Sequence, residues 1–361
     1  MTSSTFSPTD TSFSQSNADL PARFGSGQSV KRLEDDKLLI GAGQFTADVS
    51  PEDQVHLYFL RSPYPHARIV SIDSATALVM PGVLKIVTGA DLVAAGVKPI
   101  PGSVFKRIEP VPCAAPERRA LAHERVRFVG EAVVAVVALT LAQARDAAEA
   151  IEINYAELPV LVNLDDATAA DAPILNEKAV DNIAGETRYG SVPATAEAFA
   201  KAVHVVKLDI VNQRLSALTL EPRTVLAHTD PATGRLTIRL SSQMPSGVRN
   251  SVCDSLGMER ADVRVVVGDV GGGFGMKTGV YPEDLTIAFC ARALKRPIKW
   301  VADRSEEFIS ALHGRDLQTQ AELALDATGK ILALRVASKA NIGAYPTGTG
   351  AAIQLMIGPW V

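Results

Sequence analysis

Short apolar runs along the first half of the chain predict a mixture of strands and helices that begins near Arg32. Arg125–Ala138 is expected to form a pair of strands that bends at Gly130-Glu131. Thr140 is a residue type that caps helices, and it starts a predicted helix that runs to about Ala150. Four further aliphatic or β-branched stretches predict strands: Val55–Leu60, Ala67–Ile72, Val83–Val87 and Ile151–Tyr155.

The second half of the chain repeats this alternation after a polar stretch at 163–190, which is typical of a connector between domains. A hairpin is predicted from Thr224–Ala227 to Leu236–Leu240, because a five-residue turn containing proline and glycine separates them. Val203–Val211 and Val263–Val267 predict strands, and Pro245–Leu256 predicts a helix. Together these patterns indicate the α+β class.

Length, composition and charge then limit the function classes. The 361 residues are enough for two or three domains, and 47% hydrophobic with 21% charged residues is typical of a globular protein. The formal net charge is -4, and the basic residues are scattered along the chain. Neither feature favours a nucleic acid or an anionic membrane as a partner.

The termini and cysteines indicate a cytoplasmic protein. Residues 1–28 are polar and rich in serine and threonine, so we expect a disordered segment and no signal peptide. The longest apolar run, Ala132–Ala142, is too short to span a bilayer. Cys113, Cys253 and Cys290 lie far apart without a C-x-x-C pair, which argues against an iron–sulfur cluster or structural zinc in this chain and predicts reduced thiols.

A glycine loop is the most informative segment of the sequence. The strand at Val263–Val267 leads into Gly271-Gly272-Gly273-Phe274-Gly275, and a helix is predicted to open at Pro282-Glu283. Glycines permit positive φ and allow backbone N–H groups to approach an anionic or oxo ligand. This context favours a ligand site, with a tight turn in a β/α unit as the alternative.

Two phosphate-binding motifs are excluded at a single position of this loop. A P-loop requires glycine immediately before Lys277, and a G-x-G-x-x-G fingerprint that starts at Gly271 requires glycine at the same place. Met276 occupies that position. The sequence therefore disfavours a protein that binds nucleotide phosphates.

The loop resembles a molybdopterin-contacting segment of the xanthine dehydrogenase/aldehyde oxidase family, whose large subunits bind molybdenum. The G-G-G-F-G-x-K sequence follows a V-x-V-x-x-x-D-V strand, as in that family. Several further segments are similar to family segments and occur in the same order: Arg32–Asp35, Gly41–Asp48, Arg61–Ala67, Pro81-Gly82-Val83, Val129-Gly130-Glu131, Glu221-Pro222-Arg223, Ser241-Ser242-Gln243 and Arg296–Trp300.

This resemblance implies a domain organisation and a set of cofactors. Residues 29–162 would form an α/β hammerhead domain, 163–190 a connector, and 191–361 an incomplete first molybdopterin-binding domain. The cofactor would be molybdenum-molybdopterin in its cytosine dinucleotide form. FAD and [2Fe-2S] clusters would lie on partner subunits, the FAD-binding and iron–sulfur subunits of the same enzyme.

The resemblance also implies roles for individual residues, with no direct metal ligand among them. Gln243 would donate its amide to an oxo ligand of molybdenum, and Phe274 would place its ring over a small-molecule substrate. Gly271, Gly272, Gly273 and Gly275 would complete the cofactor contact. For Glu221 and Arg223, a buried ion pair and a cofactor role both remain open. His66 and His313 have no second ligand at metal spacing.

Departures from the family pattern narrow the expected activity. Family members that oxidise purines carry an acidic residue where this chain has Thr278, so carbon monoxide, aldehydes and N-heterocycles remain as substrates.

The family's G-x-G-E segment, which carries the general base, does not occur here. Glu283 is assigned to the helix dipole instead. We therefore expect no catalytic residue in this chain, an inactive isolated chain, and a second chain that supplies the missing C-terminal half. A truncated, non-catalytic remnant or binding module is the alternative.

Overall fold

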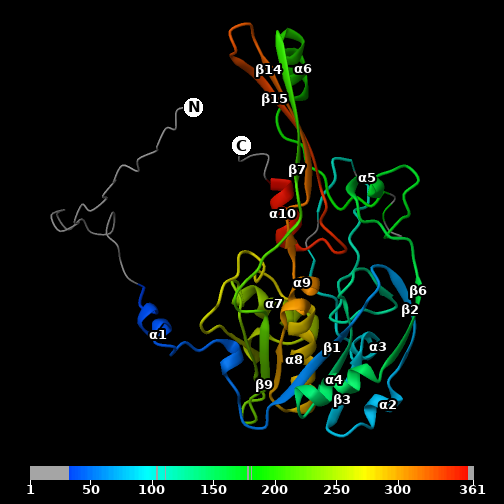
Figure 1. Ribbon diagram of the computed structural model, residues 1–361, viewed down its shortest axis with the longest axis vertical. Coiled ribbons are helices and arrows are strands. Elements are labelled where there is room, and N and C mark those ends of the chain that lie inside the picture. The colour runs from blue at the N-terminus through cyan, green and yellow to red at the C-terminus, as the bar shows by residue number, and fades with distance from the viewer. Residues whose placement is uncertain (1–31, 103–104, 110, 177–178, 180, 357–361) are drawn as a thin grey trace, which may run out of the picture. The chain divides into compact units, whose positions relative to one another are not determined.

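The computed structural model of the chain describes residues 32–102, 105–109, 111–176, 179 and 181–356 (Figure 1). It divides into two units, one ending at Gly43 and one starting at Gln44. In its described part, the first unit consists of helix α1 (Asp35–Leu39) and its flanking turns, and α1 buries no residue. The segment predicted to be disordered, residues 1–28, lies outside the described residues.

A seven-stranded mixed sheet forms the centre of the second unit. Its strand order is β11-β10-β9-β12-β1-β5-β3. Strand β1 lies between β12, with which it is parallel, and β5, with which it is antiparallel. The strands are β1 (Val55–Arg61), β3 (Val83–Thr88), β5 (Ala132–Ala138), β9 (Thr224–Thr229), β10 (Leu236–Leu240), β11 (Val263–Val266) and β12 (Ile298–Val301). Strands from both halves of the sequence therefore share one sheet.

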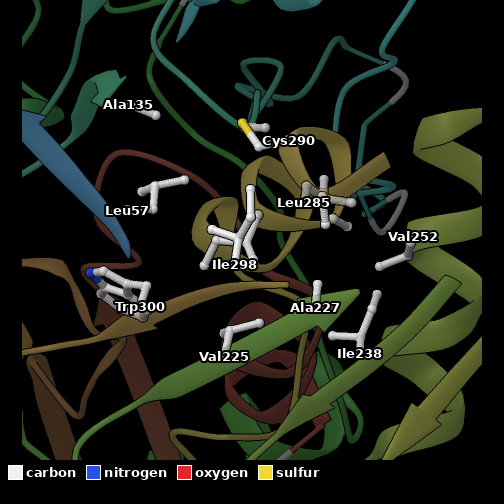
Figure 2. Packing of buried hydrophobic residues seen from close by; sticks show 14 of the residues in the cluster. Leu57, Ala135, Val225, Ala227, Ile238, Val252, Leu285, Cys290, Ile298 and Trp300 are labelled. Atoms are coloured by element: carbon white, nitrogen blue, oxygen red, sulfur yellow. The ribbon is translucent and has the colours of Figure 1, made fainter. Parts of the chain in front are cut away.

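The longer helices that pack against this sheet include α4 (Leu141–Glu149), α7 (Pro245–Leu256) and α8 (Pro282–Leu294). Figure 2 shows Leu285 of α8 and Ile298 of β12 within the same buried cluster as Val225, Ala227 and Ile238. Helix α4 begins as the sequence predicts, because the Thr140 hydroxyl accepts a hydrogen bond from the backbone N–H of Gln143. The core thus fixes the positions of the chain segments before and after the glycine loop.

Smaller elements complete the unit. Three small sheets have the orders β4-β2-β6, β13-β8 and β15-β14-β7. Their strands are β2 (Ala67–Asp73), β4 (Arg125–Val126), β6 (Glu152–Glu157), β7 (His204–Asn212), β8 (Leu215–Ser216), β13 (His313–Gly314), β14 (Leu317–Leu325) and β15 (Ile331–Ala340). The remaining elements are the 3-10 helices η2 (Thr46–Asp48) and η3 (Arg260–Asp262) and the helices α2 (Ala75–Leu78), α3 (Gly89–Ala94), α5 (Leu164–Ala167), α6 (Val192–Lys201), α9 (Arg304–Ser310) and α10 (Gly348–Met356).

The structure confirms the α+β class and most of the predicted elements, including the hairpin β9–β10. The prediction that Arg125–Ala138 forms a pair of strands is wrong, because β4 pairs with β2 whereas β5 pairs with β1 and β3. The bend at Gly130 leads the chain from one sheet to another. None of the described helices combines the length and the apolar character that crossing a bilayer requires.

Candidate functional site

The glycine loop follows β11 and leads to α8, and its last two residues, Phe274 and Gly275, are exposed. Gly272 and Gly275 have φ values of 102° and 84°, and Phe274 also adopts a left-handed conformation, with a φ of 50°. Gly271 and Gly273 do not, so the expected positive φ applies to only part of the loop. Phe274 is 77% exposed.

Three consecutive backbone N–H groups in this loop have no acceptor among the described residues. Gly271 donates to Glu221, and Gly275 donates to Gln243. The N–H groups of Gly272, Gly273 and Phe274 donate to no atom in the part of the chain that the structure describes. Adjacent backbone N–H groups form a concave site that attracts anions and oxo groups.

Gln243 lies against the same loop, between β10 and α7. Its Oε1 accepts hydrogen bonds from the backbone N–H groups of Gly275 (3.0 Å) and Lys277 (3.3 Å). The backbone N–H of Gln243 donates to the carbonyl oxygen of Lys277 at 2.8 Å. Because Oε1 is occupied, the amide is oriented with its Nε2 donor available, and no described residue accepts from that nitrogen. The structure therefore brings together Gln243 and the loop, as the resemblance implied.

A buried ion pair between Lys277 and Glu221 fixes the position of the loop. The Lys277 side chain is 1% exposed, and its Nζ donates to the carbonyl oxygen of Glu221 at 2.8 Å and to Glu221 Oε2 at 3.2 Å. Glu221 Oε2 also accepts from the N–H of Gly271 at 2.8 Å. Burial lowers the pKa of Lys277, and the charge of Glu221 opposes that shift. The two residues thus attach both ends of the loop to the chain segment that precedes β9.

Arg223 belongs to a different ion-pair network. Its guanidinium contacts Glu307 and Glu283, each at 3.1 Å, and Arg61 of β1 binds Glu283 at 2.8 Å. Burial would raise the pKa of Glu283, but the charges of Arg223 and Arg61 outweigh burial and lower it to about 2. Glu221 and Arg223 therefore pair with separate partners and not with each other. Glu283 lies in the first turn of α8, as predicted, and its side chain connects α8 to β1 and to Arg223.

The remaining candidate ligands are engaged elsewhere. The ring nitrogen Nδ1 of His66 lies 2.6 Å from the Pro159 carbonyl oxygen, and Nε2 of His313 lies 3.0 Å from that of Phe308. Among the residues described, no group of three His, Cys, Asp or Glu side chains is arranged to hold a metal ion. The three cysteines have free thiols, as expected.

The sequence alone did not identify two features of this site. The contact between Glu221 and Lys277 joins residues 56 positions apart. The second feature is a hydrogen bond of 2.8 Å from the Tyr281 hydroxyl to the carbonyl oxygen of Met276, which supports the end of the loop. Glu221 belongs to the E-P-R segment and Lys277 is the lysine of G-x-K, but no sequence pattern indicates that the two side chains meet.

Two family models match the chain. Residues 175–359 match a molybdopterin cofactor-binding domain. Residues 40–159 match the a/b hammerhead domain of aldehyde oxidase and xanthine dehydrogenase.

Curated relatives extend this likeness over most of the chain. Subunit gamma of the 6-hydroxypseudooxynicotine dehydrogenase complex of Paenarthrobacter nicotinovorans is 35% identical over 88% of this chain and 40% of its own length. The carbon monoxide dehydrogenase large chain of Hydrogenophaga pseudoflava is 35% identical over 86% of this chain and 39% of its own length. The chain thus spans about two-fifths of the length of these relatives.

Solved structures agree with the sequence comparisons. The quinoline 2-oxidoreductase from Pseudomonas putida 86 superposes with a TM-score of 0.78 and 36% identity, and the match covers 88% of this chain and 40% of that one. The carbon monoxide dehydrogenase from Oligotropha carboxidovorans superposes with a TM-score of 0.80 and 32% identity, covering 87% and 39%.

Proposed function

Because the chain belongs to the aldehyde oxidase and xanthine dehydrogenase family of molybdopterin-binding subunits, we propose that it forms one wall of the cofactor site in a molybdenum hydroxylase. The observation that carries this proposal is the set of free donors on one exposed loop. The N–H groups of Gly272, Gly273 and Phe274 and the Nε2 of Gln243 all lack acceptors among the described residues. Three of these four donors belong to the loop, and the fourth belongs to a side chain that packs against it.

These donors fit an anionic, oxo-bearing cofactor. Backbone N–H groups and a neutral amide stabilise oxo and phosphate oxygens without adding charge to the site. When bound, molybdenum-molybdopterin would supply the redox chemistry and an oxygen atom that originates from water. Lys277 and Glu221 are already paired with each other, so we assign them to positioning of the loop.

The chain's own residues would bind the cofactor and orient the substrate. Gln243 would donate to an oxo oxygen of the cofactor, while its Oε1 keeps the loop in place. The exposed ring of Phe274 would orient a flat or apolar substrate, because aromatic faces pack well against such molecules. With Thr278 in place of an acidic residue, an aldehyde, an N-heterocycle or carbon monoxide is the proposed substrate.

We further propose that other polypeptides complete the enzyme. The general base and the rest of the cofactor site would come from a chain that corresponds to the other three-fifths of the relatives. FAD and [2Fe-2S] clusters would reside on separate partner subunits, and the cofactor would be the cytosine dinucleotide form. A relative named as one subunit of a complex supports a multisubunit assembly.

Purification of the tagged chain with its partners from its source cells tests the proposal. Elemental analysis should find molybdenum, and acid hydrolysis should release CMP from the dinucleotide. The complex should oxidise at least one member of a panel of aldehydes and N-heterocycles, or carbon monoxide. A complex that contains neither molybdenum nor pterin would instead support a non-catalytic remnant or binding module.

A further inference from the structure

The Tyr281 hydroxyl joins two segments that meet beside the glycine loop. It donates a hydrogen bond to the carbonyl oxygen of Met276 at 2.8 Å and accepts one from the backbone N–H of Leu312 at 3.2 Å. Tyr281 is 3% exposed, and burial raises the pKa of its hydroxyl to about 12. The hydroxyl therefore stays protonated at neutral pH and remains a donor to Met276.

The peptide group that this hydroxyl contacts also holds Gln243. The carbonyl of Met276 and the N–H of Lys277 belong to one peptide bond, which is planar and rotates as a unit. Tyr281 binds the carbonyl oxygen of this group, and Gln243 Oε1 accepts from its N–H at 3.3 Å. Because the carbonyl and the N–H of a trans peptide point in opposite directions, fixing the carbonyl also directs the N–H toward Gln243.

The core fixes the position of Tyr281 itself. The Arg223 guanidinium lies over its ring, 4.0 Å from the centroid, and the backbone N–H of Tyr281 donates to Asp284 at 2.8 Å. Arg223 is held in turn by Glu283 and Glu307. A buried guanidinium that faces a ring is attracted to it, so the ring cannot shift without disturbing the ion-pair network. Tyr281 is thus a rigid support for the end of the loop.

We infer that Tyr281 is a positioning residue for the proposed cofactor site and acts on Gln243 through the peptide group of Met276 and Lys277. With that group fixed, Gln243 Oε1 is bound and its Nε2 is directed to a ligand. Without the hydroxyl, the peptide group can rotate and the amide can turn over. An acceptor would then face the oxo oxygen in place of a donor. The inference rests on the proposed function.

Two tyrosine substitutions in the native complex test the inference. Tyr281→Phe removes one oxygen and keeps the ring under Arg223, and turnover per bound molybdenum should fall about tenfold. This loss is smaller than the ~10²–10³ expected for removal of the donor itself. Tyr345→Phe is the matched control, because Tyr345 is also buried and its hydroxyl donates to Glu131. It should leave turnover per bound molybdenum unchanged. Equal losses in the two variants, or no loss in Tyr281→Phe, would overturn the inference.

A second variant at the same position separates the two hydrogen bonds of the hydroxyl. 4-Aminophenylalanine in place of Tyr281 keeps a donor for Met276 and offers a weaker acceptor to Leu312, so its turnover per bound molybdenum should stay within about twofold of the parent. A tenfold loss in this variant would show that the contact with Leu312 matters instead, and would overturn the inference.

A double-mutant cycle tests the route through Gln243. In a Gln243→Glu background the amide donor is already absent, so adding Tyr281→Phe should cause little further loss of turnover per bound molybdenum. Residues that act through each other show such non-additive effects. Additive losses would mean that Tyr281 acts on another part of the site, which contradicts the inference.

Hydrogen exchange in the complex, followed by mass spectrometry, gives a readout that does not depend on molybdenum. The Lys277 amide should exchange about tenfold faster in Tyr281→Phe than in the parent, and Tyr345→Phe should match the parent. Unchanged exchange in Tyr281→Phe would overturn the inference. A parent complex without molybdenum would contradict only the proposed function, whereas faster exchange at Lys277 would still support the hold of Tyr281 on the loop.

Discussion

At the scale of single residues, the proposed site gives Gln243 two functions. Its Oε1 fixes the loop through the N–H groups of Gly275 and Lys277. Its Nε2 would be available to donate a hydrogen bond to a ligand. Because the two functions lie on different atoms of one amide, different substitutions can separate them.

We expect Gln243→Glu and Gln243→Ala to differ in their effect on the loop. In the complete enzyme, either variant should lower turnover by about 10²–10³, because each loses the amide donor. Gln243→Glu keeps an acceptor for the two loop N–H groups, so its molybdenum content should remain near that of the parent, whereas Gln243→Ala should lose molybdenum as well. Steady-state kinetics and elemental analysis measure both effects, and unchanged turnover in the glutamate variant would exclude the donor role.

Gly273 is constrained by Gln243 and not by its own φ. A Cβ at position 273 would lie 2.5 Å from Gln243 Oε1, so the amide would have to move. Gly273→Ala should therefore remain folded by circular dichroism but bind far less molybdenum in the complex. Gly279→Ala is the matched control, because a Cβ there meets nothing within 4 Å. Full molybdenum occupancy in Gly273→Ala would show that the loop is only a structural turn.

At the scale of elements, the start of α8 concentrates buried charge. Asp284 accepts a hydrogen bond from the N–H of Tyr281 at 2.8 Å and so caps the helix. Burial raises the pKa of this carboxyl to about 7, and the nearby charge of Glu283 contributes to the rise. Glu283 itself remains ionised, since its pKa is lowered to about 2. Two adjacent carboxyl groups are thus held in opposite protonation states at mildly acidic pH.

Stability should therefore depend on pH through Asp284. The unfolded chain releases this proton near pH 3.8, whereas the folded chain keeps it up to about pH 7. Between these values the folded state binds more protons, so its stability falls as pH rises. Asp284→Asn, which keeps an acceptor for Tyr281, should be more stable than the parent above pH 7 by on the order of a few kcal/mol.

Urea unfolding at several pH values measures this difference, which should shrink as the pH approaches 4. Asp303→Asn, at the exposed cap of α9, controls for the loss of a capping carboxylate. A constant difference between Asp284→Asn and the parent across the pH range would contradict the expectation.

Local sequence patterns predict the helices and strands well, but they do not predict which distant strands pair with each other. The helix at Pro245–Leu256 and the hairpin β9–β10 depend on neighbouring residues, and both were predicted. The partners of β4 and β5 were not, because strand pairing depends on residues far along the chain. At the site, the glycine loop and Gln243 were recognised from their motifs, but the contact of Lys277 with Glu221 requires the folded sheet. The domain boundaries at 162 and 190 remain predictions.

At the scale of the whole molecule, the proposed cofactor wall has no free carboxylate beside it among the residues that bear on the loop and the start of α8. The carboxylates of Glu221 and Glu283 are both held in buried ion pairs. The family's base-carrying segment is absent from the sequence.

We expect the isolated chain to show no hydroxylase activity even when molybdenum cofactor is supplied. General-base catalysis contributes about 10²–10⁴ to rate, and the remaining cofactor contacts would also be missing. The purified chain can be assayed with carbon monoxide, aldehydes and N-heterocycles, with the native complex as positive control. Robust turnover by the chain alone would show that it contains a complete active site.

The parallel pairing of β1 with β12 has a consequence during protein synthesis. About 240 residues separate Val55 from its partner Ile298, although the two lie side by side in the finished sheet. At a translation rate of roughly 5–20 residues per second, β1 waits about 10–50 s on the ribosome for that neighbour. β5 emerges in the meantime and can cover one edge of β1, while β3 pairs with β5. Until β12 arrives, the nascent chain presents an open strand edge, and this interval is when a holding chaperone would protect it most.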